Sequence, residues 1–136
     1  MYSFRKSKKG FTLIELMVVV AIIAVLALLG LRLYSTQQIK AKEALVKANA
    51  GTIQVAIQTE LVDNPGLLLA DAVLLDDIQI VQNPFDGEQG NDGAFEANAA
   101  PTNEGMVTVE LSGGVFTMNS YGDGGRDLLY TVFAQP

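Results

Sequence analysis

The stretch KKGFTLIELMVVVAIIAVLALLGL, from Lys8 to Leu31, decides how the rest of the chain is read. Glu15 is its only charged residue after Gly10. A helix over residues 11–31 would be roughly 30 Å long, about the thickness of the hydrocarbon core of a bilayer. The stretch therefore predicts a membrane-spanning helix with one carboxylate near its start.

Charge is divided unevenly along the chain. Four cations stand before Gly10, namely Arg5, Lys6, Lys8 and Lys9. They supply +4 of the net −6, which leaves −10 for the residues after Gly10. Cations in front of an apolar segment predict an N-terminus in the cytoplasm and a body on the outside. Because so acidic a body repels phosphate, we expect no direct binding of nucleic acid.

The sequence contains no cysteine and no histidine. This excludes disulfide bonds, thiol nucleophiles, Cys/His metal sites and most familiar catalytic triads. Carboxylates on loops can act as acid and base, but no nucleophile, phosphate-binding loop or metal-ligand spacing accompanies them here. We therefore expect no enzymatic activity.

Three interpretations of the apolar segment differ in the role of Glu15. A cleaved secretory signal peptide has an apolar run of about 7–15 residues, which is shorter than this one. An uncleaved signal anchor agrees in length. It would, however, give the Glu15 carboxylate no cation as a partner, and inserting such a carboxylate into a membrane costs about 2.5–3.5 kcal/mol. A cut between Gly10 and Phe11 would instead create a free amine one turn from Glu15, in the same chain or in a parallel neighbour. Such a pair would fix the register between chains.

A basic leader, a glycine and a long apolar run frame the residues Gly10, Phe11, Thr12, Leu13, Ile14 and Glu15. This arrangement closely resembles the N-terminal signature of type IV pilins and pseudopilins. The resemblance implies that a prepilin peptidase removes residues 1–10 by cutting after Gly10 and N-methylates Phe11. It also implies that Glu15 pairs with a neighbour's terminal amine as the helices pack into a filament core.

Two positions depart from the family's pattern. The family commonly has a helix-interrupting proline where this chain has Arg32, and commonly a glycine where it has Ala24. Proline breaks or kinks a helix, whereas Gly30 weakens one by roughly 1 kcal/mol relative to Ala. We therefore expect the helix to continue through Arg32, which marks the membrane boundary.

Residues 34–62 are predicted to form an amphipathic half of the same helix. One apolar stripe recurs at spacings of three and four residues and consists of Val46, Ala50, Ile53, Ile57 and Leu61. A freestanding coiled coil is the alternative, but the stripe is short and rich in Ala. The sequence Asp63-Asn64-Pro65-Gly66 should end the helix near Val62.

Residues 63–136 are expected to form an acidic head. Residues 67–78 fit a short amphipathic helix, Ile78–Val81 alternate as a strand would, and residues 83–104 have loop composition. The runs MVTVEL, VFTMNSY and LLYTVF then predict three strands joined by two hairpin loops.

The predicted fold class is therefore α+β. A long N-terminal helix, transmembrane over 11–33 and amphipathic over 34–62, packs on a small antiparallel sheet of about three strands. This arrangement is similar to the general plan of type IV pilins. Many pilins close their C-terminal region with a disulfide, which this chain cannot form.

Acidic residues in two loops raise the question of a calcium site. The candidates are Asp86, Glu88, Asp92, Asp123 and Asp127, and some pseudopilins hold calcium in a comparable loop. The spacing does not fit an EF-hand, because Gly90 occupies a ligand position. Since Asp and Asn beside Gly are ordinary turn formers, we expect turns without a cofactor, with calcium as the weaker alternative.

The sequence thus predicts a structural subunit of a type IV pilus. It would be a single-pass precursor in the cytoplasmic membrane and then part of a filament at the cell surface. Expected partners are further pilin subunits, prepilin peptidase, the assembly machinery and, before assembly, membrane lipid. A periplasmic pseudopilin of a type II secretion system is one alternative. A membrane-anchored binding module that never polymerises is another, and it needs no cut at Gly10.

Overall fold

The computed structural model describes residues 10–97, 100–101, 103–125 and 127–136. These belong to two compact units, one ending at Gln37 and one comprising Gln38–Pro136. A single helix, α1 (Leu13–Asp63), contributes residues to both units. Residues 1–9 of the expected leader lie outside the described residues.

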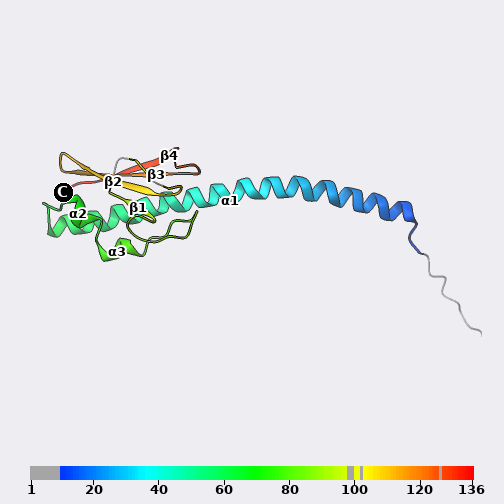
Figure 1. Cartoon of the computed structure of the whole chain (residues 1–136), viewed down its shortest axis with the longest axis horizontal. Coiled ribbons are helices and arrows are strands. Elements are labelled where there is room, and N and C mark those ends of the chain that lie inside the picture. The colour runs from blue at the N-terminus through cyan, green and yellow to red at the C-terminus, as the bar shows by residue number, and fades with distance from the viewer. Residues whose placement is uncertain (1–9, 98–99, 102, 126) are drawn as a thin grey trace, which may run out of the picture. The chain divides into compact units, whose positions relative to one another are not determined.

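The helix α1 is continuous over 51 residues (Figure 1). It passes Gly30 and Arg32 without interruption, as the absence of a proline predicts. It ends at Asp63, one residue beyond the predicted end, and the N–H of Asn64 donates to the carbonyl of Glu60 at 2.8 Å. Pro65 follows, and the residue before a proline is disfavoured in the helical conformation.

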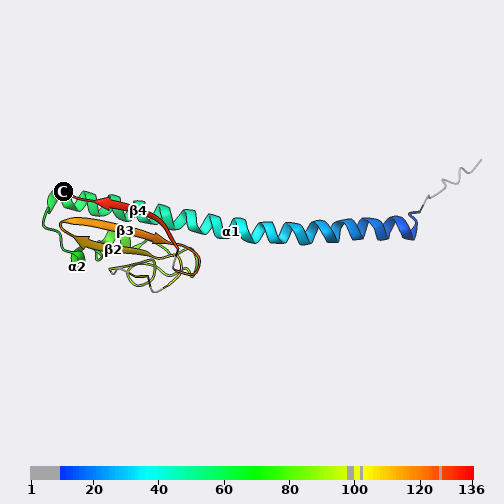
Figure 2. The ribbon, with the colours of Figure 1, turned by 90° about the horizontal axis from the view of Figure 1, so that it is seen from above.

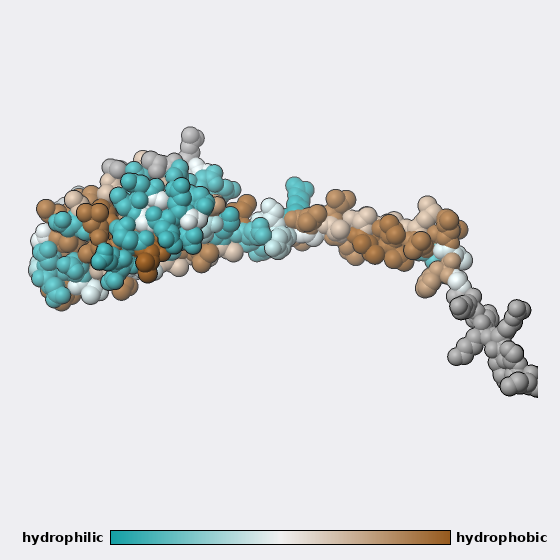
Figure 3. Space-filling view, turned by 60° about the horizontal axis from the view of Figure 1, so that its bottom comes forward, coloured by the Kyte–Doolittle hydropathy of each residue, from teal (hydrophilic) through white to brown (hydrophobic). Residues whose placement is uncertain are grey.

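The part of α1 in the first unit is apolar and uncovered. Every residue from Leu13 to Leu33 is exposed, and Figure 3 shows an almost continuous hydrophobic surface there. Among the described residues, α1 is the helix that is long and apolar enough to cross a membrane by length and composition. Because such a surface is unfavourable in water, this segment requires lipid or another protein around it.

In the second unit, the predicted stripe of α1 is buried. All five of its residues are at most 2% exposed: Val46, Ala50, Ile53, Ile57 and Leu61. They join one hydrophobic cluster with the inward side chains of the sheet, which include Val109, Phe116 and Met118. Burial of each Val, Ile, Leu, Phe or Met side chain contributes about 1.5–3 kcal/mol, so this face of α1 is a major support of the unit.

The sheet contains four strands in the described part of the chain, in the order β1-β2-β3-β4. They are β1 (Phe95–Glu96), β2 (Val107–Ser112), β3 (Val115–Tyr121) and β4 (Leu128–Ala134). The last three form the predicted antiparallel meander, and Figure 2 shows them beside the C-terminal part of α1. Gly113 and Gly114, with φ of 60° and 83°, form the tight turn between β2 and β3.

The predicted strand number and the purely antiparallel pairing are both wrong. β1 pairs in parallel with β2, so the sheet is mixed. This strand has only two residues and lies in a segment predicted as loop. No alternating pattern can mark so short a strand; its position follows from the complete burial of Phe95 in the core.

The segment after α1 is helical in two short pieces, α2 (Leu69–Ala72) and α3 (Asp76–Gln79). The alternative of a strand over Ile78–Val81 is wrong, because Ile78 and Gln79 belong to α3. A single bridge joins the next residue along, Gln82, to Gln89. Ile78 is fully buried and Ile80 is 75% exposed, so the two isoleucines do not share one face as they would in a strand.

Two glutamines of α1 cover the free edge of β4. The side-chain amide of Gln54 donates to the carbonyl of Phe133 at 2.7 Å, and that of Gln58 donates to the carbonyl of Gln135 at 2.7 Å. The N–H of Gln135 donates back to Oε1 of Gln58 at 3.2 Å. The helix thus satisfies backbone groups that a fifth strand would otherwise pair, and it fixes the C-terminal strand in a chain without disulfides.

Replacing both glutamines by leucine should loosen β4 selectively. We expect the Gln54→Leu/Gln58→Leu variant to lose about 2 kcal/mol of local stability, because three hydrogen bonds to the backbone of Phe133 and Gln135 are removed. Hydrogen exchange of the full chain in detergent should then accelerate at Phe133–Gln135 more than in β2. Gln38→Leu, an exposed position on the same helix, is the control. Uniform acceleration in β2 and β4 would contradict the proposed edge role.

Candidate functional site

The candidate site lies where α1 begins. Thr12 and Glu15 form a reciprocal capping pair: Oγ1 of Thr12 accepts from the N–H of Glu15 at 3.3 Å, and Oε2 of Glu15 accepts from the N–H of Thr12 at 2.8 Å. The Thr12 hydroxyl also donates to the same Oε2 at 2.9 Å. Two backbone N–H groups that a helix start leaves without partners are thereby satisfied.

Gly10 and Phe11 precede this cap in exposed positions. Phe11 is 90% exposed and Gly10 is exposed as well, so the bond between them is accessible. Glu15 lies in the first turn of α1, where the partial positive charge of the helix start favours a carboxylate. The predicted cleavage position, the predicted methylation position and the predicted assembly carboxylate are therefore close together in the structure.

Thr12 caps the helix, a role that was not predicted from the sequence of the apolar segment. The spacing Thr12-x-x-Glu15 before an apolar run is a recognised helix-start signal and could have revealed it. The carboxylate consequently has hydrogen-bond partners in its own chain, although both are uncharged. Its pairing with a terminal amine of a neighbour stays a prediction.

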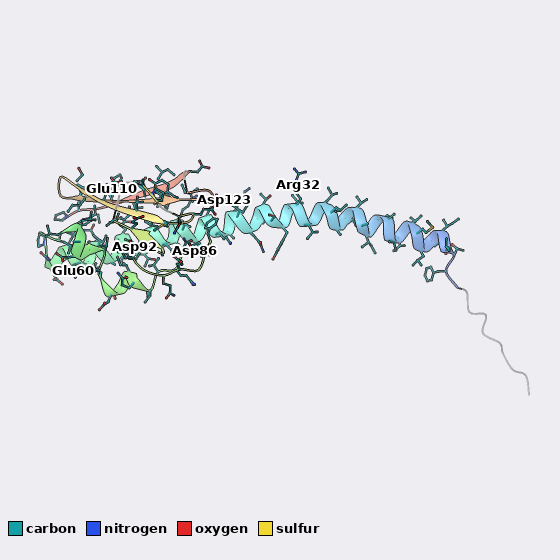
Figure 4. The ribbon with its side chains drawn as sticks, viewed as in Figure 1. Arg32, Glu60, Asp86, Asp92, Glu110 and Asp123 are labelled. Atoms are coloured by element: carbon teal, nitrogen blue, oxygen red, sulfur yellow. The ribbon has the colours of Figure 1, made fainter. Side chains whose placement is uncertain are left out.

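The structure does not bring the calcium candidates together. Among the described residues, no group of three or more acidic side chains is placed to hold a metal ion. Asp86 and Asp92 lie between α3 and β2, whereas Asp123 lies between β3 and β4 (Figure 4). Glu88 lies in the first of these loops, and Asp127 is the last residue before β4. Calcium binding stays an untested prediction.

A buried asparagine organises the first of these loops. Asn83 is 0% exposed, and its amide donates to the carbonyls of Glu104 at 2.7 Å and Gly93 at 3.3 Å, and to Oδ2 of Asp86 at 3.1 Å. Its Oδ1 accepts from the N–H of Phe85 at 2.9 Å. Asp86 in turn accepts from the N–H of Glu88 at 2.9 Å, which is the turn geometry expected of Asp.

Gly105 permits this arrangement. Its φ is 72°, and a side chain there would overlap the ring of Phe85 and the amide of Asn83. Lys42 of α1 lies 5.1 Å from the centre of the same ring, which is within range of a cation–π contact. The acidic loop is thus held by packing and hydrogen bonds around Asn83.

Comparison with known proteins identifies the start of the chain. Residues 5–31 match the family described as the prokaryotic N-terminal methylation motif. The chain carries that motif. The match contains Gly10, Phe11 and Glu15. Together with the fimbrial relatives, it confirms the predicted resemblance to type IV pilins over this region.

The relatives found by sequence are fimbrial proteins. The chain is 43% identical over 56 residues to the type IV major fimbrial protein FimA of Dichelobacter nodosus. The aligned region covers 41% of this chain and 36% of that protein. It is 44% identical over 54 residues to the fimbrial protein EcpB of Eikenella corrodens, or 40% of this chain and 34% of the relative. A probable minor fimbrial protein of Dichelobacter nodosus is 43% identical over 58 residues, 43% of this chain and 36% of the relative.

These matches span about a third of the length of each relative. No solved structure matches the chain significantly. The α+β fold, with a long apolar N-terminal helix and a small sheet, is consistent with a type IV pilin.

Proposed function

We propose that this protein is a structural subunit of a type IV pilus. The observation that carries the proposal is the methylation motif at residues 5–31, whose Glu15 lies in the first turn of a helix with an uncovered apolar surface. The fimbrial relatives support the same function. Assembly with copies of itself would bury the apolar segment. The acidic second unit would then be displayed on the outside of the filament.

In this proposal, prepilin peptidase cuts after Gly10 and methylates the new N-terminus at Phe11. The precursor spans the cytoplasmic membrane once, with its cationic leader in the cytoplasm. The cut creates an amine next to the capping pair of Thr12 and Glu15. An amine adds the attraction between opposite charges to the hydrogen bond, whereas the threonine donors are uncharged. A neighbour's amine can therefore replace the threonine as the main partner of the carboxylate.

The subunit would need no catalytic activity of its own. A pseudopilin that works in the periplasm has the same N-terminal requirements, so the release of processed chains into surface filaments is what separates the two proteins. A membrane-anchored binding module would keep its leader, because a tether has no use for a new terminus.

Intact-mass spectrometry of filaments sheared from cells, and of the membrane pool, tests the proposal. We expect the sheared species to begin at Phe11 and to carry one added methyl group. A species of the same mass found only in membranes would favour the pseudopilin. A chain that still begins at Met1 would overturn the proposed processing.

A further inference from the structure

The second half of α1 carries another apolar stripe, opposite the buried one. Its residues alternate at spacings of three and four: Leu45, Ala48, Thr52, Val55, Thr59 and Val62. By helix geometry this stripe lies about half a turn from the buried stripe. Leu45, Val55 and Val62 are 55%, 65% and 76% exposed, so neither the sheet nor the short helices cover them. We call this surface the outer stripe.

The outer stripe borders a shallow depression of about 500 Å³. The depression is lined by mostly small side chains of α1 and by Asp77 of α3. The lining residues of α1 are Ala48, Gly51, Thr52, Val55, Ala56 and Thr59. A floor of small residues lets another helix approach closely, and ridges of larger side chains can enter it.

Each copy of the chain contains a surface that complements this one. The apolar segment Leu13–Leu33 is an exposed helix made mainly of Leu, Ile and Val, which are larger than most side chains that line the depression. Arg32 is the only Lys or Arg between Gly10 and Lys40, and Figure 4 shows it projecting from α1. Asp77 is the carboxylate that lines the depression, so the two surfaces also match in charge.

We propose that the outer stripe docks the apolar segment of a second copy of this chain, so that Arg32 of one copy pairs with Asp77 of the next. The proposal rests on the proposed function and specifies which surface of the second unit takes part in assembly. The two surfaces differ, so the contact is head-to-tail. Each added copy leaves one surface of each kind free, which permits an open filament. The pair lies beside apolar side chains, where water screens charges less than at an open surface.

Engineered cysteines provide a direct test, because the chain has none of its own. We expect sheared filaments of the Arg32→Cys/Asp77→Cys variant to give a ladder of disulfide-linked oligomers after oxidation. In the control, Arg32→Cys/Asp123→Cys, the second cysteine occupies an exposed position on the β3–β4 connection, and no ladder should form. A head-to-tail contact links many copies, whereas a contact between identical positions stops at dimers.

Charge reversal gives an independent measurement if the cysteine variant assembles poorly. Arg32→Glu and Asp77→Arg should each lower the amount of sheared filament by about tenfold, and the double variant should recover most of the loss. Filaments of the Arg32→Cys/Asp77→Cys variant that give no ladder, or single reversals with normal filament amounts, would overturn the docking surface. The proposed function would stand in that case, because the chain still forms filaments. Wild-type chains found only as membrane monomers would overturn the proposed function, and lipid would then be what covers the apolar segment.

Discussion

A Glu15→Ala strain should process the chain normally and yet yield at least about tenfold less sheared filament than wild type. Loss of one partner of a buried ion pair costs about 3–5 kcal/mol, and every 1.4 kcal/mol is a factor of ten. In the proposed filament each subunit would leave a neighbour's amine unpaired in an apolar environment. Quantitative immunoblots of the sheared and membrane fractions measure the ratio, and the mass of the membrane species reports processing.

Thr12→Val is the matched control for this experiment. It removes both side-chain hydrogen bonds of Thr12 to Glu15 and keeps the carboxylate. Loss of the cap costs about 1 kcal/mol of helix stability, so filaments should fall only modestly. If Thr12→Val and Glu15→Ala reduced filaments equally, capping alone would explain Glu15. If Glu15→Ala left filaments at normal abundance, the assembly role would be refuted.

The Asn83→Ala substitution should cause a large loss of stability in the second unit. It would leave the carbonyls of Gly93 and Glu104 and the N–H of Phe85 without the partner they have now. Each buried unsatisfied group costs about 1–3 kcal/mol, and we expect a total near 3 kcal/mol once the loop relaxes. Amide exchange in β2 should then accelerate roughly a hundredfold, measured on the full chain in detergent.

The exposed Asn91, in the same loop, is the control position. Asn91→Ala should change exchange in β2 by less than about threefold, because its backbone N–H, which donates to Gln79, is retained. Acceleration confined to residues 83–93 after Asn83→Ala would show that the loop opens independently of the sheet. The proposed supporting role of Asn83 would then be wrong.

Local patterns in the sequence predicted much of the architecture. The apolar run after Gly10 specified an exposed helix, because an uninterrupted apolar segment needs no tertiary contact to be recognised. The stripe from Val46 to Leu61 specified the buried face of α1, since its spacing matches the helical repeat. Paired glycines at 113 and 114 specified the turn between β2 and β3, because such a turn needs positive φ. The motif containing Phe11 and Glu15 is likewise contiguous in sequence.

Tertiary structure decided the features that join residues distant in sequence. Gln54 and Gln58 lie outside the apolar stripe that the helical repeat predicted, yet their side-chain amides donate to the backbone carbonyls of Phe133 and Gln135. Asn83 belonged to a segment of loop composition, yet it joins Gly93 and Glu104 in the buried centre of that loop. Polar side chains show no periodicity that reveals their partners, because a hydrogen bond depends on geometry that only the folded chain supplies. The sequence by itself therefore determined the helix, its buried face and the N-terminal methylation motif. The fold alone determined the parallel strand β1, the contacts of Gln54 and Gln58 beside β4, and the uncovered outer stripe.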